Sequence, residues 1–418
     1  IFKMIKYQKA IRIINKIHLN LPDEKISTLD SLNRICAKNI LSKAKNPLSN
    51  NTAFDGFALL AKETRGLSRK KIKKFKILKS IGAGDNPKIM NYKKNSSIEI
   101  MTGAIIPRPF NTIIPVEKVK YYPSKKKPTH IVLDHEIKKF SFIRFAGEDF
   151  DLKDVVIKKG ELIQPKHIMA LTTLGIKNLY VKKKPKIIFF GTGNEIVDYK
   201  KKNISDWNVR NSNNHYFMSF GKSLHYQVID GGVIKDNQQK KLKEKLKKTF
   251  KSDIDLFVTS GAISAGKFDF IPELLKKLEF KTYFKGVYIK PGRPIMLSKF
   301  SRKEKLFFGL PGNPISCAAG FRFFIYPLLR NSLGMTKEKR FKAKLINKYS
   351  KRKNFTHFAR CLIHVDSKGL IKLKVIKEQQ SHRIKSFTEA DCWGIFPSGK
   401  DRFKPGNIIE WVPLIPGS

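Results

Sequence analysis

A short turn between two apolar segments contains the first residues whose types and spacing suggest chemistry. The run Lys305–Leu310 is short and apolar, as expected of a parallel strand that is buried on both faces. Pro311-Gly312 turns the chain, and Asn313-Pro314 then supplies an N-cap residue and a proline at the first helical position. Backbone N–H groups at such a helix start can bind a phosphate or another anion. An ordinary cap without a ligand explains the turn equally well, so the turn alone leaves both interpretations open.

Several further loops carry residue types that suit an anionic substrate. They are Gly191–Glu195 with its carboxylate, the Gly/Ser loop Ser260–Gly266, the segment Lys290–Pro294 with two cations, and the acidic residues Asp236 and Asp269. Carboxylates beside phosphate-binding cations are explained if Mg²⁺ bridges them, because Mg²⁺ prefers carboxylate and substrate phosphate oxygens. The combination predicts phosphoryl or nucleotidyl chemistry. Taken singly, the two aspartates are more readily explained as helix caps, and the loop glycines are weak signals.

Strands that alternate with helices from Pro185 onward place these loops at one edge of a sheet. The predicted strands are Lys186–Phe190, Tyr226–Asp230, Asp255–Thr259, Thr282–Ile289 and Lys305–Leu310. The predicted helices run from Asn211–Asn214 to about Leu224, from Asp236 or Asn237 to Phe250, over Asp269–Leu278 and over Ile315–Leu329. This alternation indicates a mostly parallel sheet with right-handed crossovers. Ligands of such sheets bind beyond the carboxyl ends of the strands, where the loops described above lie.

The parts before and after this segment have a different pattern. Residues 1–45 are predicted to be helical, with an apolar stripe over Ser27–Ile40, and Gln164–Leu174 is predicted to form a further helix. Short strands separated by turn signals predict a small β-rich domain over Lys74–Leu133. The C-terminal part, Lys342–Ser418, is again β-rich and predicts a small barrel or sandwich.

Composition limits the classes of protein that fit the chain. A length of 418 residues predicts two to four domains, and 41% hydrophobic residues suffice for a sizeable interior. No stretch approaches ~18 consecutive apolar residues, so we expect no transmembrane span. The basic start, Ile1–Lys16, lacks an apolar block and a cleavage site and is interpreted as a surface helix rather than a signal peptide. Four cysteines without CxxC or metal-binding spacing indicate free thiols in a reducing cytosol: Cys36, Cys317, Cys361 and Cys392.

The formal net charge of +51 suggests nucleic acid or a membrane surface as a partner. However, the lysines are spread along the whole chain together with abundant Ile, Asn and Phe, which is typical of a drift towards A/T-rich codons. No RNP-type aromatic motif, zinc-finger spacing or Gly/Arg tract accompanies the charge. We therefore expect neither a nucleic-acid nor a membrane partner. A basic surface still favours small anionic substrates.

Seven motifs occur in one order and together carry a resemblance to a known family. They are the DGFA around Asp55, MTGA at 101–104, GED at 147–149, GTGNE at 191–195, TSGAISAG at 259–266, KPGRP at 290–294 and GLPGNP at 309–314. In this order they resemble the MoeA family of molybdopterin molybdenumtransferases, which is related to the E domain of gephyrin. The resemblance spans nearly the whole chain.

The resemblance implies an α/β multidomain fold with four parts. Residues 1–45 and 147–182 would form an elongated N-terminal domain that is helical and extended, and 46–146 would form an inserted β-rich domain. Residues 183–334 would form a MogA-like, three-layer, parallel-sheet α/β catalytic domain, followed by a β-barrel-like domain at 341–418. The resemblance also implies a homodimer whose cleft lies between the α/β domain of one chain and the β domain of the other.

The implied reaction takes adenylylated molybdopterin and molybdate, with Mg²⁺ assisting, in the cytoplasm. The adenylate is hydrolysed and the metal enters the dithiolene, which gives the molybdenum cofactor and AMP. Because the pterin supplies the sulfur ligands, the protein needs no cysteine constellation. A transient contact with a MogA-type adenylyltransferase is also implied.

The matched motifs imply the roles of individual residues. The implied catalytic residues are Asp55, Asp149, Glu195, Asp236, Asp269, Lys290 and Arg293, of which Glu195, Asp236 and Asp269 would bind Mg²⁺. Residues implied to bind substrate or cofactor are Thr102, Asn213, Ser260, Gly261, Ser264, Pro294, Pro311, Gly312, Pro314, Arg360, Ser381 and Arg383. Among these, Lys290, Arg293 and Pro294 would hold molybdate or phosphate.

The chain also departs from the family pattern. Ala262 replaces the usual second glycine of its loop, Asn194 and Asn211 replace aspartates, and Arg293 replaces a lysine. Arg293 keeps the charge but changes the donor geometry, whereas the two lost carboxylates predict weaker metal binding. Two alternative functions stay open at this point. One is a related enzyme that cleaves another adenylylated pterin or nucleotide, and the other is a basic scaffold or nucleic-acid-binding protein that retains the fold.

Overall fold

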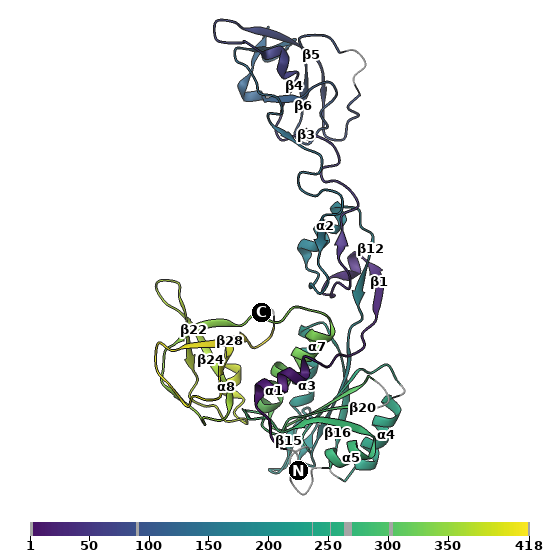
Figure 1. Cartoon of the computed structure of the whole chain (residues 1–418), viewed down its shortest axis with the longest axis vertical. Helices are drawn as coiled ribbons and strands as arrows, with labels where there is room; N and C mark the ends of the chain where they lie inside the picture. Colours follow the sequence, from purple (N-terminus) through teal and green to yellow (C-terminus); the bar gives the residue numbers. More distant parts are fainter. Residues whose placement is uncertain are drawn as a thin grey trace.

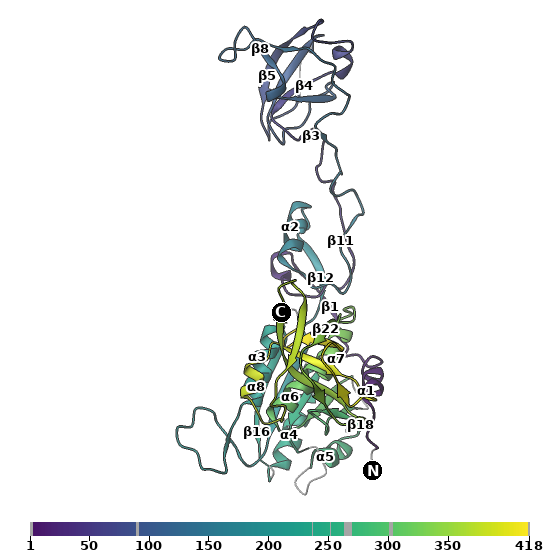
Figure 2. The same cartoon turned by 90° about the vertical axis from the view of Figure 1, so that its left-hand side faces the viewer.

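The computed structural model describes residues 3–88, 92–235, 237–250, 252–262, 270–300 and 304–416, which form an elongated molecule (Figure 1). A β-rich part lies at one end, and an α/β sheet with a C-terminal barrel lies at the other (Figures 1 and 2). A slender part that contains α2 (Pro165–Thr173), β1 (Asp23–Ser27) and β12 (Asn178–Lys182) connects them. None of the helices in the described ranges has the length and apolar sequence that crossing a bilayer requires.

The β-rich part at the far end is built on one six-stranded sheet. In spatial order its strands are β7 (Thr112–Pro115), β4 (Gly56–Leu59), β6 (Ser96–Ile100), β5 (Lys73–Ile81), β9 (His130–Leu133) and β8 (Lys120–Tyr122). Its core includes Phe57, Phe75 and Ile98, which have no exposed surface. A short pair, β3 (Asn51–Thr52) with β10 (Ile143–Arg144), lies where this part joins the rest of the chain. The predicted β-rich character is confirmed.

The slender part corrects one expectation. The helix expected over Ser27–Ile40 is absent from the described structure, in which β1 pairs antiparallel with β12, and β2 (Ile40–Leu41) pairs with β11 (Val155–Ile157). The prediction assumed that the apolar stripe packs against a core, but Leu29 and Leu32 are 74% and 42% exposed and face solvent. Between these strands the segment forms only a 3₁₀ turn at Leu29–Ser31 and isolated bridges from Ile35 and Cys36 to Leu162 and Val181. Contacts with residues far along the chain thus replaced the local helical pattern.

Near the N-terminus, α1 (Tyr7–Ile14) buries one face against the α/β core. Tyr7, Ala10 and Ile14 follow the helical repeat of three to four residues, and all three belong to that core. The ring of Tyr7 meets Phe324 and Phe358 edge to face, with centroids 5.6 and 5.1 Å apart. The division of the chain into four parts stays a prediction, and within it α1 packs with the α/β part.

The α/β sheet is mostly parallel, as predicted. Its spatial order is β16 (Gln227–Ile234), β13 (Lys186–Thr192), β17 (Leu256–Ser260), β21 (Leu306–Leu310), β20 (Met296–Phe300) and β18 (Phe280–Lys285). The first four strands are parallel, and β20 is antiparallel to both of its neighbours. The single strand predicted over Thr282–Ile289 is wrong: β18 ends before Gly286, whose φ of +84° is left-handed. Beyond it, β19 (Ile289–Lys290) pairs with the barrel instead.

Helices cover both faces of this sheet. They are α3 (Asn213–Ser223), α4 (Gln239–Phe250), α5 (Ile271–Lys277), α6 (Pro314–Gly320) and α7 (Tyr326–Ser332), with a π-helical turn at Phe321–Ile325 between the last two. Successive residues of β13 alternate between two cores: Phe189 packs in the cluster with Phe217, and Phe190 packs in the cluster with Leu242. Burial on both faces explains why the strands read as continuous apolar runs.

The C-terminal part is a closed five-stranded barrel, so of the two forms expected the barrel is confirmed. The strands follow the order β24 (Thr356–Val365), β25 (Ile371–Val375), β22 (Phe341–Leu345), β28 (Ile408–Pro413) and β26 (Cys392–Phe396), and β26 pairs back with β24. The barrel packs on the α/β part through Phe323, whose ring stacks on Phe358 at 3.7 Å. All four cysteines are free and buried, as expected.

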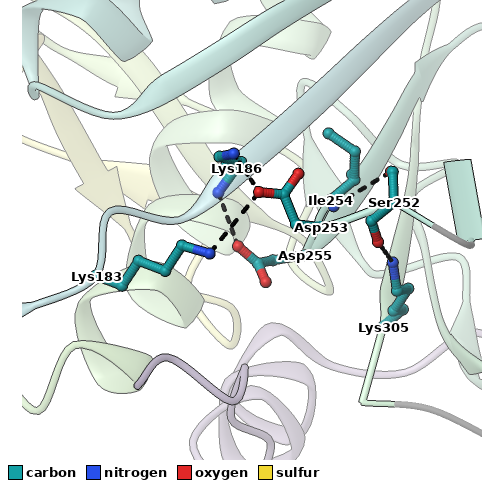
Figure 3. A network of polar contacts seen from close by, with 7 residues as sticks. All are labelled: Lys183, Lys186, Ser252, Asp253, Ile254, Asp255 and Lys305. Atoms are coloured by element: carbon teal, nitrogen blue, oxygen red, sulfur yellow. Dashed lines mark hydrogen bonds and ion pairs between the residues drawn. The ribbon is translucent and has the colours of Figure 1, made fainter. Parts of the chain in front are cut away.

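A polar network holds the amino-terminal edge of the α/β sheet (Figure 3). The backbone N–H of Lys186, the first residue of β13, donates to Asp255 Oδ2 at 2.8 Å, and the Lys186 ammonium pairs with Asp253. Lys305, which precedes β21, donates to the Ser252 carbonyl. Burial raises the pKa of Asp255. These carboxylates join strand starts, opposite the edge at which the ligand site is predicted, so we interpret them as structural.

Candidate active site

The predicted strand–turn–helix is present, with β21 ending at Leu310 and α6 beginning at Pro314. Asn313 is the N-cap residue, but its side chain does not cap the helix. Its amide Nδ2 instead donates to Ser381 Oγ at 2.9 Å, and the backbone N–H of Ile315 donates to the Ser381 carbonyl at 3.1 Å. The barrel loop that contains Ser381 therefore binds part of the helix start that the sequence analysis predicted as a possible anion site.

A cationic cavity of about 440 Å³ lies between the α/β sheet and the barrel. Lys290 and Arg293 line it from the α/β side, and Lys351 and Arg352 line it from the barrel. The described residues around this cavity include no Asp or Glu. The side chains of Lys290 and Arg293 make no hydrogen bond or ion pair with the described part of the chain. Four cations without a carboxylate suit an oxyanion.

A second cavity, of about 840 Å³, adjoins the first, and the two share Pro294, Pro311 and Asn313. Its lining residues from the predicted loops include Glu195, Gly261, Gly312 and Pro314, and Asn213 lies at the predicted start of a helix. The loops after β13, β17 and β21 thus meet at the carboxyl edge of the sheet, as the alternating pattern indicated.

The carboxylate of Glu195 lies free in the larger cavity. Both of its oxygens fold over Gly193, where an added Cβ would lie 2.5 Å from each. Within the described ranges this carboxylate accepts no hydrogen bond and joins no ion pair. The Lys235 ammonium fixes the loop by donating to the carbonyls of Asn194 and Ile196 at 2.8 and 2.6 Å. A fixed loop with an unpaired carboxylate can bind a hard cation such as Mg²⁺.

Hydrogen bonds between neighbouring loops hold the floor of the larger cavity. Asn213 Nδ2 donates to the Gly312 carbonyl at 2.7 Å, and the N–H of Gly261 donates to the Leu310 carbonyl at 2.8 Å. Gly261 has a φ of +93°, and a Cβ there would lie 2.6 Å from Thr192 Oγ1. The following Ala262 has a φ of +52°, which is left-handed although alanine has a Cβ. The structure therefore accepts alanine in place of the usual second glycine, but with some strain in the backbone of Ala262.

Three further polar residues of these loops are Asn211 and Asn194, which depart from the family pattern, and Ser260, which was predicted to bind substrate. Asn211 Oδ1 accepts the N–H of Asn214 at 3.3 Å, so the amide supports the start of α3. Ser260, at the end of β17, has a buried hydroxyl without a partner and does not line either cavity. Asn194 accepts a hydrogen bond from the Lys235 ammonium through its backbone carbonyl, a contact that does not depend on its side chain.

Arg360 has a different position from the one implied by the sequence match. It is 1% exposed, and it does not line either cavity. Its guanidinium donates to the carbonyls of Glu378, Gln380 and Arg383, at 2.8–3.2 Å. Burial lowers the pKa of Arg360 to about 10. The side chain thus supports the loop that presents Ser381, while the exposed Arg383 side chain pairs with Glu378 at 3.6 Å.

Three further predicted residues, Asp55, Thr102 and Asp149, do not line either cavity. Thr102 donates to Asp55 Oδ1 through its backbone N–H and its hydroxyl, each at 2.7 Å, and these bonds lower the pKa of Asp55. Asp149 Oδ2 accepts a hydrogen bond from Asn46 Nδ2 at 2.8 Å. The Asp55 turn precedes β4 in the distal β-rich part, so one chain does not bring it to the two cavities (Figure 1).

Some predictions could not be placed, and some lining residues had not been predicted. Asp236, Ser264 and Asp269 lie outside the described residues. Within the described ranges there is no group of three or more His, Cys, Asp or Glu side chains that could hold a metal. The sequence reasoning missed Lys351, Arg352 and His357 in the smaller cavity. The basic run that begins at Lys351, shortly before the Phe358-Ala359-Arg360 segment, was an available signal.

These features define an elongated multidomain protein in which an α/β sheet and a barrel enclose a cationic cavity beside a larger one. Comparison with known proteins gives its family. The family model of the MoeA N-terminal region (domain I and II) matches residues 5–175, and that of the MoeA C-terminal region (domain IV) matches 342–414. Between them, a probable molybdopterin binding domain matches 189–331. The chain belongs to the MoeA family.

Similar proteins support the assignment. The chain is 28% identical to proteins named molybdopterin molybdenumtransferase from Staphylococcus epidermidis and Staphylococcus aureus, over 98% of its own length and 95% of theirs. A structure of the molybdopterin biosynthesis MoeA protein from Pyrococcus horikoshii is 25% identical, with a TM-score of 0.82 over 99% of each chain. A second structure of that protein, at 23% identity and a TM-score of 0.83, shows the same fold.

Proposed function

We propose that this chain transfers molybdenum from molybdate to molybdopterin, in the biosynthesis of the molybdenum cofactor. The observation that carries the proposal is the pair of adjoining cavities that share Pro294, Pro311 and Asn313. The smaller one is cationic and suits an oxyanion, and the larger one suits an organic ligand. Joining an oxyanion to an organic ligand requires both to be held side by side, and adjoining sites supply that proximity.

The proposal assigns roles to the residues that line the two cavities. Lys290 and Arg293 hold molybdate, since neither side chain has a partner in the described part of the chain. Asn213, Gly261 and Gly312 hold the molybdopterin, which we propose to be adenylylated, so that its hydrolysis releases AMP. Ser260, Pro314, Ser381 and Arg383 stay proposed contacts, as does Ser264.

Mg²⁺ belongs to the same proposal. The unpaired carboxylate of Glu195 in the larger cavity fits a hard cation, and Mg²⁺ needs only one or two carboxylates when a substrate phosphate completes its shell. Asp236 and Asp269 are the proposed further ligands. When bound, Mg²⁺ supplies positive charge at the phosphate oxygens of the adenylate.

We further propose a homodimer. Asp55 precedes β4 and Thr102 follows β6 in the β-rich part, at the opposite end of the molecule from the α/β sheet, so they can contribute to its site only from a second copy (Figure 1). Asp149, between β10 and β11, is proposed to act with them. A cytoplasmic location is in keeping with four free cysteines, since thiols stay reduced there. A transient contact with a MogA-type adenylyltransferase would supply the adenylylated substrate.

One assay tests the proposal against its alternatives. Purified protein receives adenylylated molybdopterin, molybdate and Mg²⁺, and AMP release and the reconstitution of an apo-molybdoenzyme are measured. We expect both, each dependent on molybdate. AMP release that needs no molybdate would favour a different pyrophosphate-cleaving enzyme. No release, together with salt-sensitive RNA binding, would favour the basic scaffold.

A further inference from the structure

A histidine that the family motifs do not single out lines the cationic cavity. His357, the second residue of β24, is among the lining residues, although only 2% of its surface is exposed. Its Nε2 is buried and has no hydrogen-bond partner. An unpartnered buried nitrogen costs roughly 1–3 kcal/mol, so such an atom calls for a ligand or another explanation.

The other ring nitrogen, Nδ1, bonds a tyrosine hydroxyl. Nδ1 is hydrogen-bonded to the hydroxyl of Tyr349, and this hydroxyl has no other partner in the described part of the chain. If the tyrosine O–H donates to Nδ1, the proton left without an acceptor is the one on Nε2. In the reverse arrangement it is the phenol proton, and Nε2 has no N–H to donate. An oxyanion in the cavity can accept the proton of Nε2, so its binding favours the tautomer whose free N–H is on Nε2.

The charges around the ring keep it neutral. Burial, followed by Lys290, Lys351 and Arg360, lowers the pKa of His357 to about 3. These three cations and the Tyr349 hydroxyl are the charged or titratable groups that act on the ring from its own strand and the segments packed against it. A neutral imidazole can donate one hydrogen bond without adding to the repulsion among the cations.

We propose that His357 binds the oxyanion directly, by donating a hydrogen bond from Nε2 to one of its oxygens, with Tyr349 as the positioning residue. This inference rests on the proposed function, since it concerns the same substrate. The cations attract the charge of the oxyanion without fixing its orientation. The imidazole N–H is held on a strand at one position, so it selects an oxygen that lacks a proton.

Molybdate binding to the full-length chain, measured by titration calorimetry, tests the proposal. We expect His357→Leu to weaken binding about ten- to a hundredfold, because one hydrogen bond to a charged group is lost. His357→Gln, which can still donate from its side-chain amide, should recover part of that loss. His364→Leu is the matched control, because His364 lies on the same strand and is exposed. It should bind like the unaltered protein.

The tautomer of His357 can be measured in the unaltered protein, so this second test does not require a variant that folds. In ¹⁵N-histidine-labelled protein we expect the His357 signals of the Nε2–H tautomer, and a shift of the Nε2 signal when molybdate is added. Tyr349→Phe should redistribute the tautomers and weaken molybdate binding about three- to tenfold. An Nδ1–H tautomer, or an Nε2 signal that does not move at saturating molybdate, would overturn the proposal.

The outcomes separate this inference from the proposed function. If the unaltered protein and His357→Leu both bind molybdate while Lys290→Ala does not, only the role of His357 is wrong. If the unaltered protein binds no molybdate, the proposed function fails and the inference fails with it. If binding falls in His357→Leu and recovers in part in His357→Gln, the direct contact is supported.

Discussion

Two neighbouring residues of one loop should respond in opposite directions to substitutions between glycine and alanine. Gly261 has a φ of +93°, and an added Cβ would lie 2.6 Å from Thr192 Oγ1 and 2.8 Å from the Thr192 carbonyl oxygen. The hydroxyl is tied to the Ser260 carbonyl at 2.7 Å, and the carbonyl is backbone, so neither moves easily. Ala262 already has a Cβ at a φ of +52°.

Gly261→Ala should therefore be strongly destabilising. The left-handed backbone costs about 1–2 kcal/mol for an L residue, and the overpacked contact costs about 1–3 kcal/mol more. The sum of about 2–5 kcal/mol corresponds to a melting temperature lowered by at least roughly 4 °C for an α/β part of this size. Because the loop lines the larger cavity, molybdopterin binding should weaken as well.

Ala262→Gly is the matched control. The substitution removes about 1–2 kcal/mol of backbone strain from the folded state. It also stabilises the unfolded state by about 0.4–1 kcal/mol, because a chain with glycine has more conformational entropy. We expect a change between none and about 1.6 kcal/mol in the stabilising direction. Thermal unfolding and a fluorescence titration with molybdopterin measure both variants. A Gly261→Ala protein that melts and binds normally, or an Ala262→Gly protein that is equally impaired, would refute the reasoning.

Three further predictions follow from the geometry. Asp55→Ala and Lys290→Ala chains, each inactive, should regain AMP release when mixed into heterodimers; inactive heterodimers of verified composition would argue against a site shared between chains. Glu338→Ala should lower the free energy of unfolding by about 3–5 kcal/mol, because it leaves the buried guanidinium of Arg322 without its bidentate partner; Arg322 is 1% exposed. A melting temperature within a degree of the unaltered protein would contradict this. Burial and nearby cations lower the pKa of His357 to about 3, so between that value and about 6.5 the folded chain binds fewer protons than the unfolded chain. Stability should therefore fall with falling pH by up to about 1.4 kcal/mol per unit, and thermal unfolding at pH 5 and 7 should show a weaker dependence in His357→Gln.

The sequence predicted the parts of the fold that local patterns determine. The runs that became β13, β17 and β21 are apolar because helices cover both faces of the sheet, and that pattern is visible without a structure. The Pro-Gly and Asn-Pro punctuation placed the start of α6 at Pro314 correctly. Since parallel strands end at one edge, the loops that line the larger cavity could be grouped before any contact was known.

Contacts between residues far apart in the sequence could not be predicted in this way. The segment with the apparent helical stripe forms only a 3₁₀ turn at Leu29–Ser31 between the β1–β12 and β2–β11 pairs, and β19 left its expected strand to pair with β24. The Ile315 N–H bonds the Ser381 carbonyl only because the barrel docks on the α/β sheet. No local pattern around Pro314 indicates that its helix start is already occupied.

The position of Arg360 shows how a residue can match a ligand-binding motif and yet not line either cavity. All of its donated hydrogen bonds go to carbonyls of the 378–383 loop, an arrangement that the rigid fork of a guanidinium supports and an ammonium does not. That loop carries Ser381, which accepts from Asn313, and Asn313 forms part of both cavities. The barrel arginine therefore influences the wall between the cavities through two intermediates. We expect a change in Arg360 to alter the position of Asn313, and with it the relative placement of the two proposed ligands, while the cations that line the smaller cavity stay in place.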